Sequence, residues 1–196
     1  MYNWNVFCDG SYHPDSNVGG YAFTITGDFL TVKIIVSSAG VYLNSIDAEM
    51  AGAIEALVYI RRMIRNQIAG YGGSEDLNGY PTAEAFDPKQ YGRFSDSQHL
   101  VTIHCDNLDV VNTINLAVTH IEDEYVTASM LRLLSLVRLK TTSNDDVVVT
   151  ATYVPAHTRG TDHNSIRQDE VDALAKRASA TLFKLQGEDY DDCDDS

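Results

Sequence analysis

Val6-Phe7-Cys8-Asp9 and Ile103-His104-Cys105-Asp106 share one pattern, in which a run of strand-forming residues ends in a cysteine followed by an aspartate. Side chains alternate between the faces of a strand, so each aspartate points opposite to the cysteine before it. If the two strands are parallel neighbours, Asp9 and Asp106 lie side by side at their carboxyl ends, where open α/β sheets place their sites. Carboxylates this close repel each other unless a cation lies between them.

Strand and helix patterns extend outward from these two stretches. Apolar alternation and helical spacing predict strands at 2–9, 21–26, 30–37, 100–105 and 147–154, and helices at 45–68, 108–116, about 122–140 and 165–185. Ser45 or Asp47 is expected to cap the first helix. This order predicts an α/β fold with a mixed sheet, antiparallel at its start and covered by helices.

Two segments lie outside this pattern. Residues 70–98 are rich in Gly, Tyr, Asp and Ser and read as an inserted loop, either a solvated surface loop or a binding arm. Residues 188–196 carry six acids and no base, and we expect a disordered tail that either adds solubility or docks on a basic partner. The remaining 1–187 are expected to form one catalytic domain.

Two further acids can join the pair of aspartates. Glu49 lies in the first turn of the first long helix, and Asp172 lies near the start of the last one. Four carboxylates without histidine or cysteine ligands suit hard ions, Mg²⁺ or Mn²⁺, rather than zinc. Two such ions can activate a water and stabilise the leaving oxygen of a phosphodiester.

Each of these acids also has an ordinary structural explanation. Asp9 before a glycine is typical of a turn, Glu49 can answer the dipole of its helix, and Asp172 follows a run of acids typical of a solvated helix face. The four together indicate a site because their sequence contexts match one family in order.

Four blocks carry that resemblance. The first block is Asp9-Gly10-Ser11 with Gly19-Gly20-Tyr21-Ala22, and the second is Ala48-Glu49-Met50-Ala51. The third is Ile103-His104-Cys105-Asp106-Asn107, and the fourth is Val154-Pro155-Ala156-His157 followed by Val171-Asp172-Ala173-Leu174. In this order they resemble the ribonuclease H family, with a type 1-like pattern. They span nearly the whole chain apart from 70–98. Each block is weak alone, and their order makes the resemblance specific.

The resemblance implies the ribonuclease H fold, a five-stranded mixed sheet whose fourth and fifth strands run parallel to the first. It also implies a two-metal endonuclease, using two Mg²⁺ ions or Mn²⁺, that cuts the RNA of an RNA–DNA hybrid and leaves 5′-phosphate and 3′-hydroxyl ends. Carried over, the metal ligands and catalytic residues are Asp9, Glu49, Asp106 and Asp172, with His157 assisting proton transfer or product release. The candidates for contacts with substrate are Gly10, Ser11 and Asn44, where the 2′-hydroxyls would be read.

The chain departs from the family in its substrate-binding features. Ile46 stands where many relatives have an asparagine three residues before the catalytic glutamate. The link at 119–124 is short and acidic instead of a basic protrusion, and we expect no hybrid-binding domain before the first strand. A net charge of −14, or −8 without the tail, also opposes a broad basic surface.

The remaining bulk features predict the setting. No apolar run approaches a membrane span, no secretory signal is visible at the N-terminus, and three cysteines do not form a disulfide framework. We therefore expect a cytoplasmic monomer without membrane contact. Two alternatives to ribonuclease H remain: a nuclease of the same fold acting on structured DNA, and a non-catalytic binding module that retains the fold.

Overall fold

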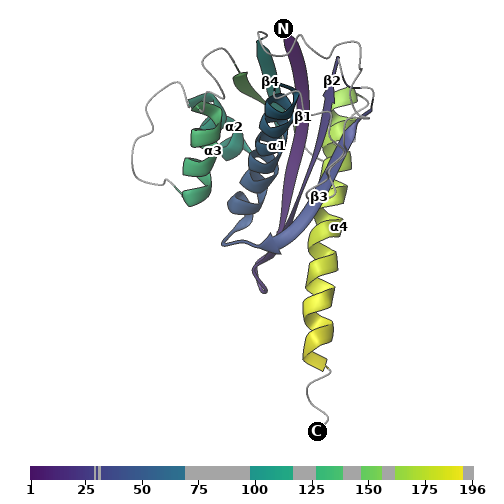
Figure 1. The fold of residues 1–196 in the computed structure, drawn as a ribbon. Helices are drawn as coiled ribbons and strands as arrows, with labels where there is room; N and C mark the ends of the chain where they lie inside the picture. Colours follow the sequence, from purple (N-terminus) through teal and green to yellow (C-terminus); the bar gives the residue numbers. More distant parts are fainter. Residues whose placement is uncertain are drawn as a thin grey trace.

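The sheet has five strands in the order β3-β2-β1-β4-β5 (Figure 1). The computed structural model describes residues 1–28, 30, 32–68, 98–116, 127–138, 147–155 and 162–191, without the side chains of 65–68 and 186–191. The strands are β1 (Tyr2–His13), β2 (Val18–Gly27), β3 (Ile34–Val41), β4 (His99–Cys105) and β5 (Val147–Tyr153). β1, β2 and β3 pair antiparallel, and β4 and β5 run parallel to β1. The predicted sheet is confirmed.

β1 is longer than predicted. It pairs with β4 as far as Phe7 opposite His104, and then continues beside β2 alone to His13 opposite Val18. The sequence prediction ended the strand at Asp9 because a glycine follows, and this end is wrong. Asp9 instead faces Ala22 within the antiparallel pair, at the point where β1 has lost its parallel neighbour.

Two other predicted boundaries are also wrong. β3 begins at Ile34 rather than at residue 30, because the register with β2 places Ile34 opposite Ile25 and Val41 opposite Val18. The first helix is capped by Asn44, whose Oδ1 accepts a hydrogen bond from the Asp47 backbone nitrogen at 2.9 Å. An amide oxygen at this position satisfies one of the helix's unpaired N–H groups, which is the role predicted for Ser45 or Asp47.

The helices lie on both faces of the sheet (Figure 1). The structure describes α1 (Ser45–Ile68), α2 (Leu108–Leu116), α3 (Ala128–Arg138) and α4 (His163–Asp191). The main core lies between α1, α2, α3 and one face of the sheet, and it contains Trp4, Val6 and Cys8 of β1. A smaller core on the opposite face packs Phe7 against Val171 of α4. Alternation along β1 therefore directs Cys8 toward α1 and Asp9 toward the α4 side.

The last helix extends beyond its predicted end. α4 runs to Asp191, four residues into the predicted acidic tail, and its C-terminal part continues past the sheet (Figure 1). The boundary predicted at 187 thus falls inside a helix, while 192–196 lie outside the described residues. The insertion at 70–98 also lies outside them except for Gln98. The whole acidic link at 119–124 and the part of the third helix predicted before 127 lie outside them as well. Within the described part of the chain, no helix is long and apolar enough to cross a membrane.

Candidate metal centre

Asp9 is an almost completely buried carboxylate, with 2% of its surface exposed. Its Oδ1 accepts a hydrogen bond from the Gly10 backbone nitrogen at 2.7 Å, whereas its Oδ2 has no hydrogen-bond partner. Burial, followed by the charge of Asp106, raises the pKa of Asp9 to about 7. An ionised carboxylate oxygen without a donor is costly in the interior, so this side chain calls for a cation.

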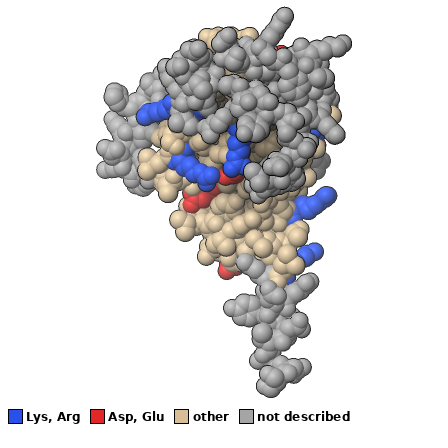
Figure 2. Space-filling model, viewed as in Figure 1, with Lys and Arg blue, Asp and Glu red and all other residues tan. Residues whose placement is uncertain are grey.

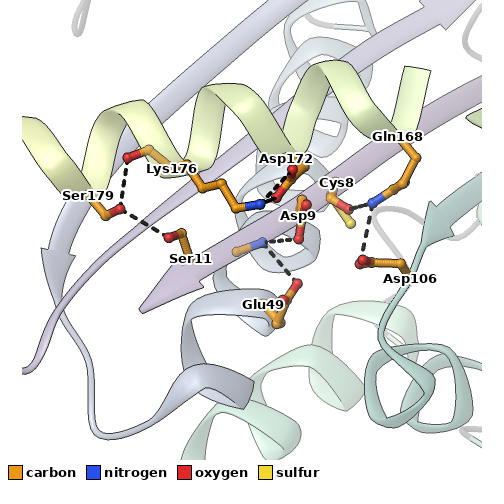
Figure 3. Close-up of polar contacts among 10 residues, drawn as sticks. Cys8, Asp9, Ser11, Glu49, Asp106, Gln168, Asp172, Lys176 and Ser179 are labelled. Atoms are coloured by element: carbon orange, nitrogen blue, oxygen red, sulfur yellow. Dashed lines mark hydrogen bonds and ion pairs between the residues drawn. The ribbon is translucent and has the colours of Figure 1, made fainter. Parts of the chain in front are cut away.

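Glu49 reaches the same backbone nitrogen from the other side. Its Oε2 accepts a hydrogen bond from Gly10 N at 2.9 Å, so Asp9 and Glu49 share one donor (Figure 3). Burial, followed by the charge of Asp9, raises the pKa of Glu49 to about 11. Without an ion at neutral pH, Glu49 therefore holds a proton and Asp9 is about half protonated, so an ion that binds both must displace protons.

Gly10 makes this approach of α1 to β1 possible. A Cβ at this position would lie 2.4 Å from the Glu49 backbone nitrogen and 2.5 Å from the Ala48 carbonyl carbon. Both are backbone atoms at the start of α1, so they cannot turn aside as a flexible side chain would. Only glycine allows the helix start to lie against the strand here, and the carboxylate of Glu49 arrives beside Asp9 as a consequence.

Asp106 follows the last residue of β4. One ligand atom each from Glu49, Cys105 and Asp106 lie within 4.8 Å of one another. The Oδ1 of Asp106 accepts a hydrogen bond from the Nε2 of Gln168 on α4 at 3.4 Å. The charge of Asp106 raises the pKa of Asp9, so the two side chains are close enough to interact electrostatically.

Asp172 lies on the third turn of α4, on the side that faces β1 (Figure 3). Its carboxylate forms an ion pair with Lys176, one turn later, at 2.8 Å. Its charge also contributes to the raised pKa of Asp9, although it is the smallest of the causes. Val171, the residue before it, is buried against the sheet and fixes this part of the helix. The structure thus brings all four predicted acids into one region from β1, α1, the end of β4 and α4.

The donor set fits hard divalent cations. Asp9, Glu49, Asp106 and Asp172 offer carboxylate oxygens, which are the ligands that Mg²⁺ and Mn²⁺ prefer. The unpartnered oxygen of Asp9 and the raised pKa values of Asp9 and Glu49 show that negative charge is crowded here without compensation. A bound cation supplies that compensation, and Lys176 supplies a part of it at Asp172.

The predicted substrate-binding residues lie beside this region. Gly10 is half-buried between the two acids, and Ser11 follows it on β1, where its Oγ accepts a hydrogen bond from buried Ser179 of α4 at 3.1 Å. Asn44 uses its Oδ1 to cap α1, and its side chain is half-buried. His157, the predicted catalytic histidine, lies outside the described residues.

Gln168 is a site residue that sequence reasoning missed. Its side chain is completely buried, and its Nε2 donates both to the Cys8 carbonyl at 3.1 Å and to Asp106 at 3.4 Å (Figure 3). One amide thereby joins α4 to β1 and to the end of β4. The available signal was its spacing, since Gln168 lies four residues before Asp172 and must share its face of the helix.

The comparisons with known proteins agree with this architecture. No family model and no curated protein matches the sequence. Among solved structures, the chain is similar to the N-terminal ribonuclease H domain of rv2228c from Mycobacterium tuberculosis, studied as a fusion with maltose-binding protein. The two sequences are 13% identical, the TM-score is 0.58, and the match covers 95% of this chain and 99% of that one.

Two further solved structures give the same result. LC11-RNase H1 in complex with an RNA/DNA hybrid matches at 11% identity and a TM-score of 0.56 over 92% of this chain and 99% of that chain. RNase H1 from the archaeon Halobacterium salinarum matches at 14% identity and a TM-score of 0.51 over 90% and 96%. At such identities the likeness concerns the fold: a five-stranded mixed sheet with helices on both faces gives this chain a ribonuclease H-like fold.

Proposed function

We propose that this protein is a ribonuclease H, an endonuclease that hydrolyses the RNA strand of RNA–DNA hybrids and leaves 5′-phosphate and 3′-hydroxyl ends. The observation that carries the proposal is the convergence of four carboxylates on a ribonuclease H-like fold. Asp9 comes from β1, Glu49 from α1, Asp106 from the end of β4 and Asp172 from α4 (Figure 3). A binding module would have no use for charges that crowd one another at such a cost.

The four carboxylates would hold two Mg²⁺ ions, for which Mn²⁺ can substitute. When bound, such ions lower the pKa of a water and neutralise charge on a phosphodiester. The chain's own residues hold the ligands in place. Gly10 N fixes Asp9 and Glu49, Gln168 orients Asp106, and burial of Val171 fixes the turn that carries Asp172.

The substrate contacts in this proposal involve Gly10, Ser11 and Asn44. Gly10 and Ser11 follow Asp9 on β1, and Asn44 caps the helix that carries Glu49. The proposed contacts are with 2′-hydroxyls of the RNA strand, which distinguish RNA from DNA. One similar solved structure, LC11-RNase H1, contains an RNA/DNA hybrid, which supports this choice of substrate. His157 is proposed to assist proton transfer or product release.

The proposed partner is an RNA–DNA hybrid. We propose that the protein acts as a cytoplasmic monomer. A basic protein partner for residues 188–196 stays a prediction. The distribution of charge supports a nucleic-acid substrate better than the net value of −14 does. On the face shown in Figure 2, Lys and Arg side chains cover more of the described surface than Asp and Glu do. The ion pair of Arg132 with Glu55, at 2.9 Å, joins α3 to α1.

Cleavage of a labelled RNA–DNA hybrid in Mg²⁺ or Mn²⁺ tests the proposal, with single-stranded RNA, double-stranded RNA and double-stranded DNA beside it. We expect metal-dependent loss of the hybrid RNA alone. Asp106→Asn should abolish it, because the amide lacks the charge that holds an ion, and Asp109→Asn, at an exposed aspartate three residues further on, is the matched control. Cleavage of DNA instead, or equal activity of both variants, would overturn the proposal.

A further inference from the structure

Cys105 carries a thiol, a possible metal ligand that the four-carboxylate site does not use. It ends β4 immediately before Asp106, and it is completely buried. Its Sγ lies within 4.8 Å of ligand oxygens of both Glu49 and Asp106, and those two oxygens lie within 4.8 Å of each other. One sulfur and two carboxylate oxygens are thus gathered at the carboxyl end of β4. Ligands about 2.0–2.3 Å from one ion lie at most about 4.6 Å apart, so the limit of 4.8 Å places these three atoms near the spacing of ligands to one ion.

The sulfur of Cys105 has two polar contacts, a side-chain hydrogen bond with Cys8 and one with the backbone of Asn107. Its Sγ accepts a hydrogen bond from the Asn107 backbone nitrogen at 3.4 Å, a contact that stabilises negative charge on sulfur. Cys8, the corresponding cysteine of β1, behaves differently, because its Sγ donates to the His104 carbonyl at 3.9 Å. The two cysteines are both buried and both face α1, but only Cys105 belongs to the three-residue cluster.

A second observation independently points to a cation. Asp9 is 2% exposed, and its Oδ2 has no hydrogen-bond partner among the described residues. Its other oxygen shares the Gly10 nitrogen with Glu49, so the unpartnered oxygen belongs to the same group of acids. A buried carboxylate oxygen beside the cluster therefore lacks a hydrogen-bond donor, and a cation would compensate its charge once Asp9 is ionised.

We propose that Glu49, Cys105 and Asp106 form a binding site for a thiophilic divalent ion of the Zn²⁺ or Cd²⁺ class. Sulfur with carboxylate ligands suits these softer ions, whereas Mg²⁺ avoids sulfur. Binding breaks the S–H bond of Cys105 and the O–H bond of Glu49, forms metal–sulfur and metal–oxygen bonds and releases both protons to solvent, with no change of oxidation state. Three protein ligands leave a fourth position open on a tetrahedral ion.

The site shares Glu49 and Asp106 with the carboxylate set, so a thiophilic ion there excludes Mg²⁺ from the same oxygens. Such an ion inhibits any activity that depends on Mg²⁺ at these residues. The inhibition rests on the proposed nuclease function. The binding itself does not, because it follows from the donor atoms alone.

Cd²⁺ titration of the metal-free full-length chain tests the site, with the thiolate-to-cadmium charge-transfer absorption in the near ultraviolet as readout. Cys193→Ser is the reference protein, because it removes the one cysteine outside the described residues. We expect the absorption band in this reference and in the matched control, which adds Cys8→Ser. Cys105→Ser in the same background should lose the band. A band that survives Cys105→Ser, or one that Cys8→Ser abolishes equally, overturns the proposal.

A second variant, which retains every thiol, keeps the proposal testable if Cys105→Ser does not fold. Glu49→Gln has nearly the same volume as the native side chain and should raise the Cd²⁺ dissociation constant at least about tenfold, since even outer partners of metal ligands contribute that much. Far-ultraviolet circular dichroism checks each variant for folding. If Cys105→Ser fails to fold, an unchanged Cd²⁺ affinity in Glu49→Gln overturns the site by itself.

Hybrid cleavage in Mg²⁺, with and without Cd²⁺, separates this site from the proposed function. Cleavage by the reference protein that Cd²⁺ abolishes, together with the Cys105-dependent band, supports both. The band without any cleavage supports the thiophilic site and overturns the nuclease proposal. Cleavage without a band overturns the thiophilic site and leaves the nuclease proposal standing.

Discussion

Asp9→Asn is expected to stabilise the metal-free protein at pH 8, although it removes a proposed metal ligand. Asp9 is buried, one of its oxygens has no hydrogen-bond partner, and the charges of Asp106 and Asp172 act against its ionisation. The amide retains an oxygen that can accept the hydrogen bond from Gly10, and it replaces the unpartnered oxygen with a donor. The substitution therefore removes a cost and preserves the local geometry.

The magnitude follows from the pKa of Asp9, which is about 7 in the folded protein against an ordinary value of 3.8. Because the folded-state pKa is the higher one, ionisation favours the unfolded chain, and stability falls as the pH rises from about 4 through 7. At pH 8 the full difference of about three pKa units corresponds to roughly 4 kcal/mol. At pH 5 the folded state keeps its proton while most unfolded chains have lost theirs, so the cost is roughly 2 kcal/mol.

Urea unfolding in the presence of EDTA measures this effect at both pH values. We expect Asp9→Asn to raise the free energy of unfolding at pH 8 by about 2–4 kcal/mol, and by about half as much at pH 5. Asp15→Asn, at an exposed turn residue, is the control and should change it by less than about 0.5 kcal/mol. Adding Mg²⁺ should stabilise the wild type much more than the variant, because ligand binding to the folded state adds stability. A loss of stability in metal-free Asp9→Asn at pH 8 would refute the crowding of charge on which the site rests.

Four further outcomes are expected. Gly10→Ala should lower Mg²⁺ affinity and cost about 1–3 kcal/mol of stability, because the added Cβ would meet the Glu49 backbone at 2.4 Å. Calorimetry and urea unfolding measure both effects, with Gly40→Ala, where the nearest contact of an added Cβ is 3.6 Å, as the control. Equal behaviour of the two variants would contradict this prediction. Gln168→Leu should weaken Mg²⁺ binding about 10–100-fold, because it releases Asp106 and leaves the Cys8 carbonyl unpaired. In the same Mg²⁺ titration, the control Gln98→Leu, at an exposed side chain, should leave the affinity unchanged. His157→Ala should slow turnover and spare metal binding, and unchanged steady-state rates would exclude a role in catalysis. Hybrid binding should be weak and should fall with salt in filter-binding assays, so nanomolar affinity that persists at about 200 mM salt would contradict it.

The pairing of Asp9 with Asp106 could be predicted because it requires only that side chains alternate along a strand and that the two strands are parallel neighbours. Cys8 and Cys105 each precede an aspartate, so the two strands present matching side chains once they pair in parallel. The burial of Met50 and Leu57 on α1 likewise followed from helical spacing. These features depend on local periodicity, which a sequence displays directly.

The finer features of the site depend on contacts between distant segments. Gln168 donates to a carbonyl 160 residues earlier in the chain, and no local pattern assigns a partner to a buried amide. Gly10 N can donate to both Asp9 and Glu49 only if the start of α1 lies against β1. The one sign of this packing in the sequence is the glycine itself. Strand alternation places Cys105 opposite to Asp106, and only the bend after β4 brings its sulfur near the Asp106 carboxylate.

The acidity of the chain belongs mostly to segments other than the scaffold of the site. Of 28 acidic residues, 16 lie outside the described side chains, and the 12 within them stand against nine Lys and Arg. Four of those 12 are Asp9, Glu49, Asp106 and Asp172. The remaining eight acids are fewer than the nine bases, so two divalent ions at the site would leave this part of the protein slightly positive. On the proposed function, binding of the metal would itself create the charge that a nucleic acid requires, and hybrid affinity should therefore depend on Mg²⁺ even when no bond is cut.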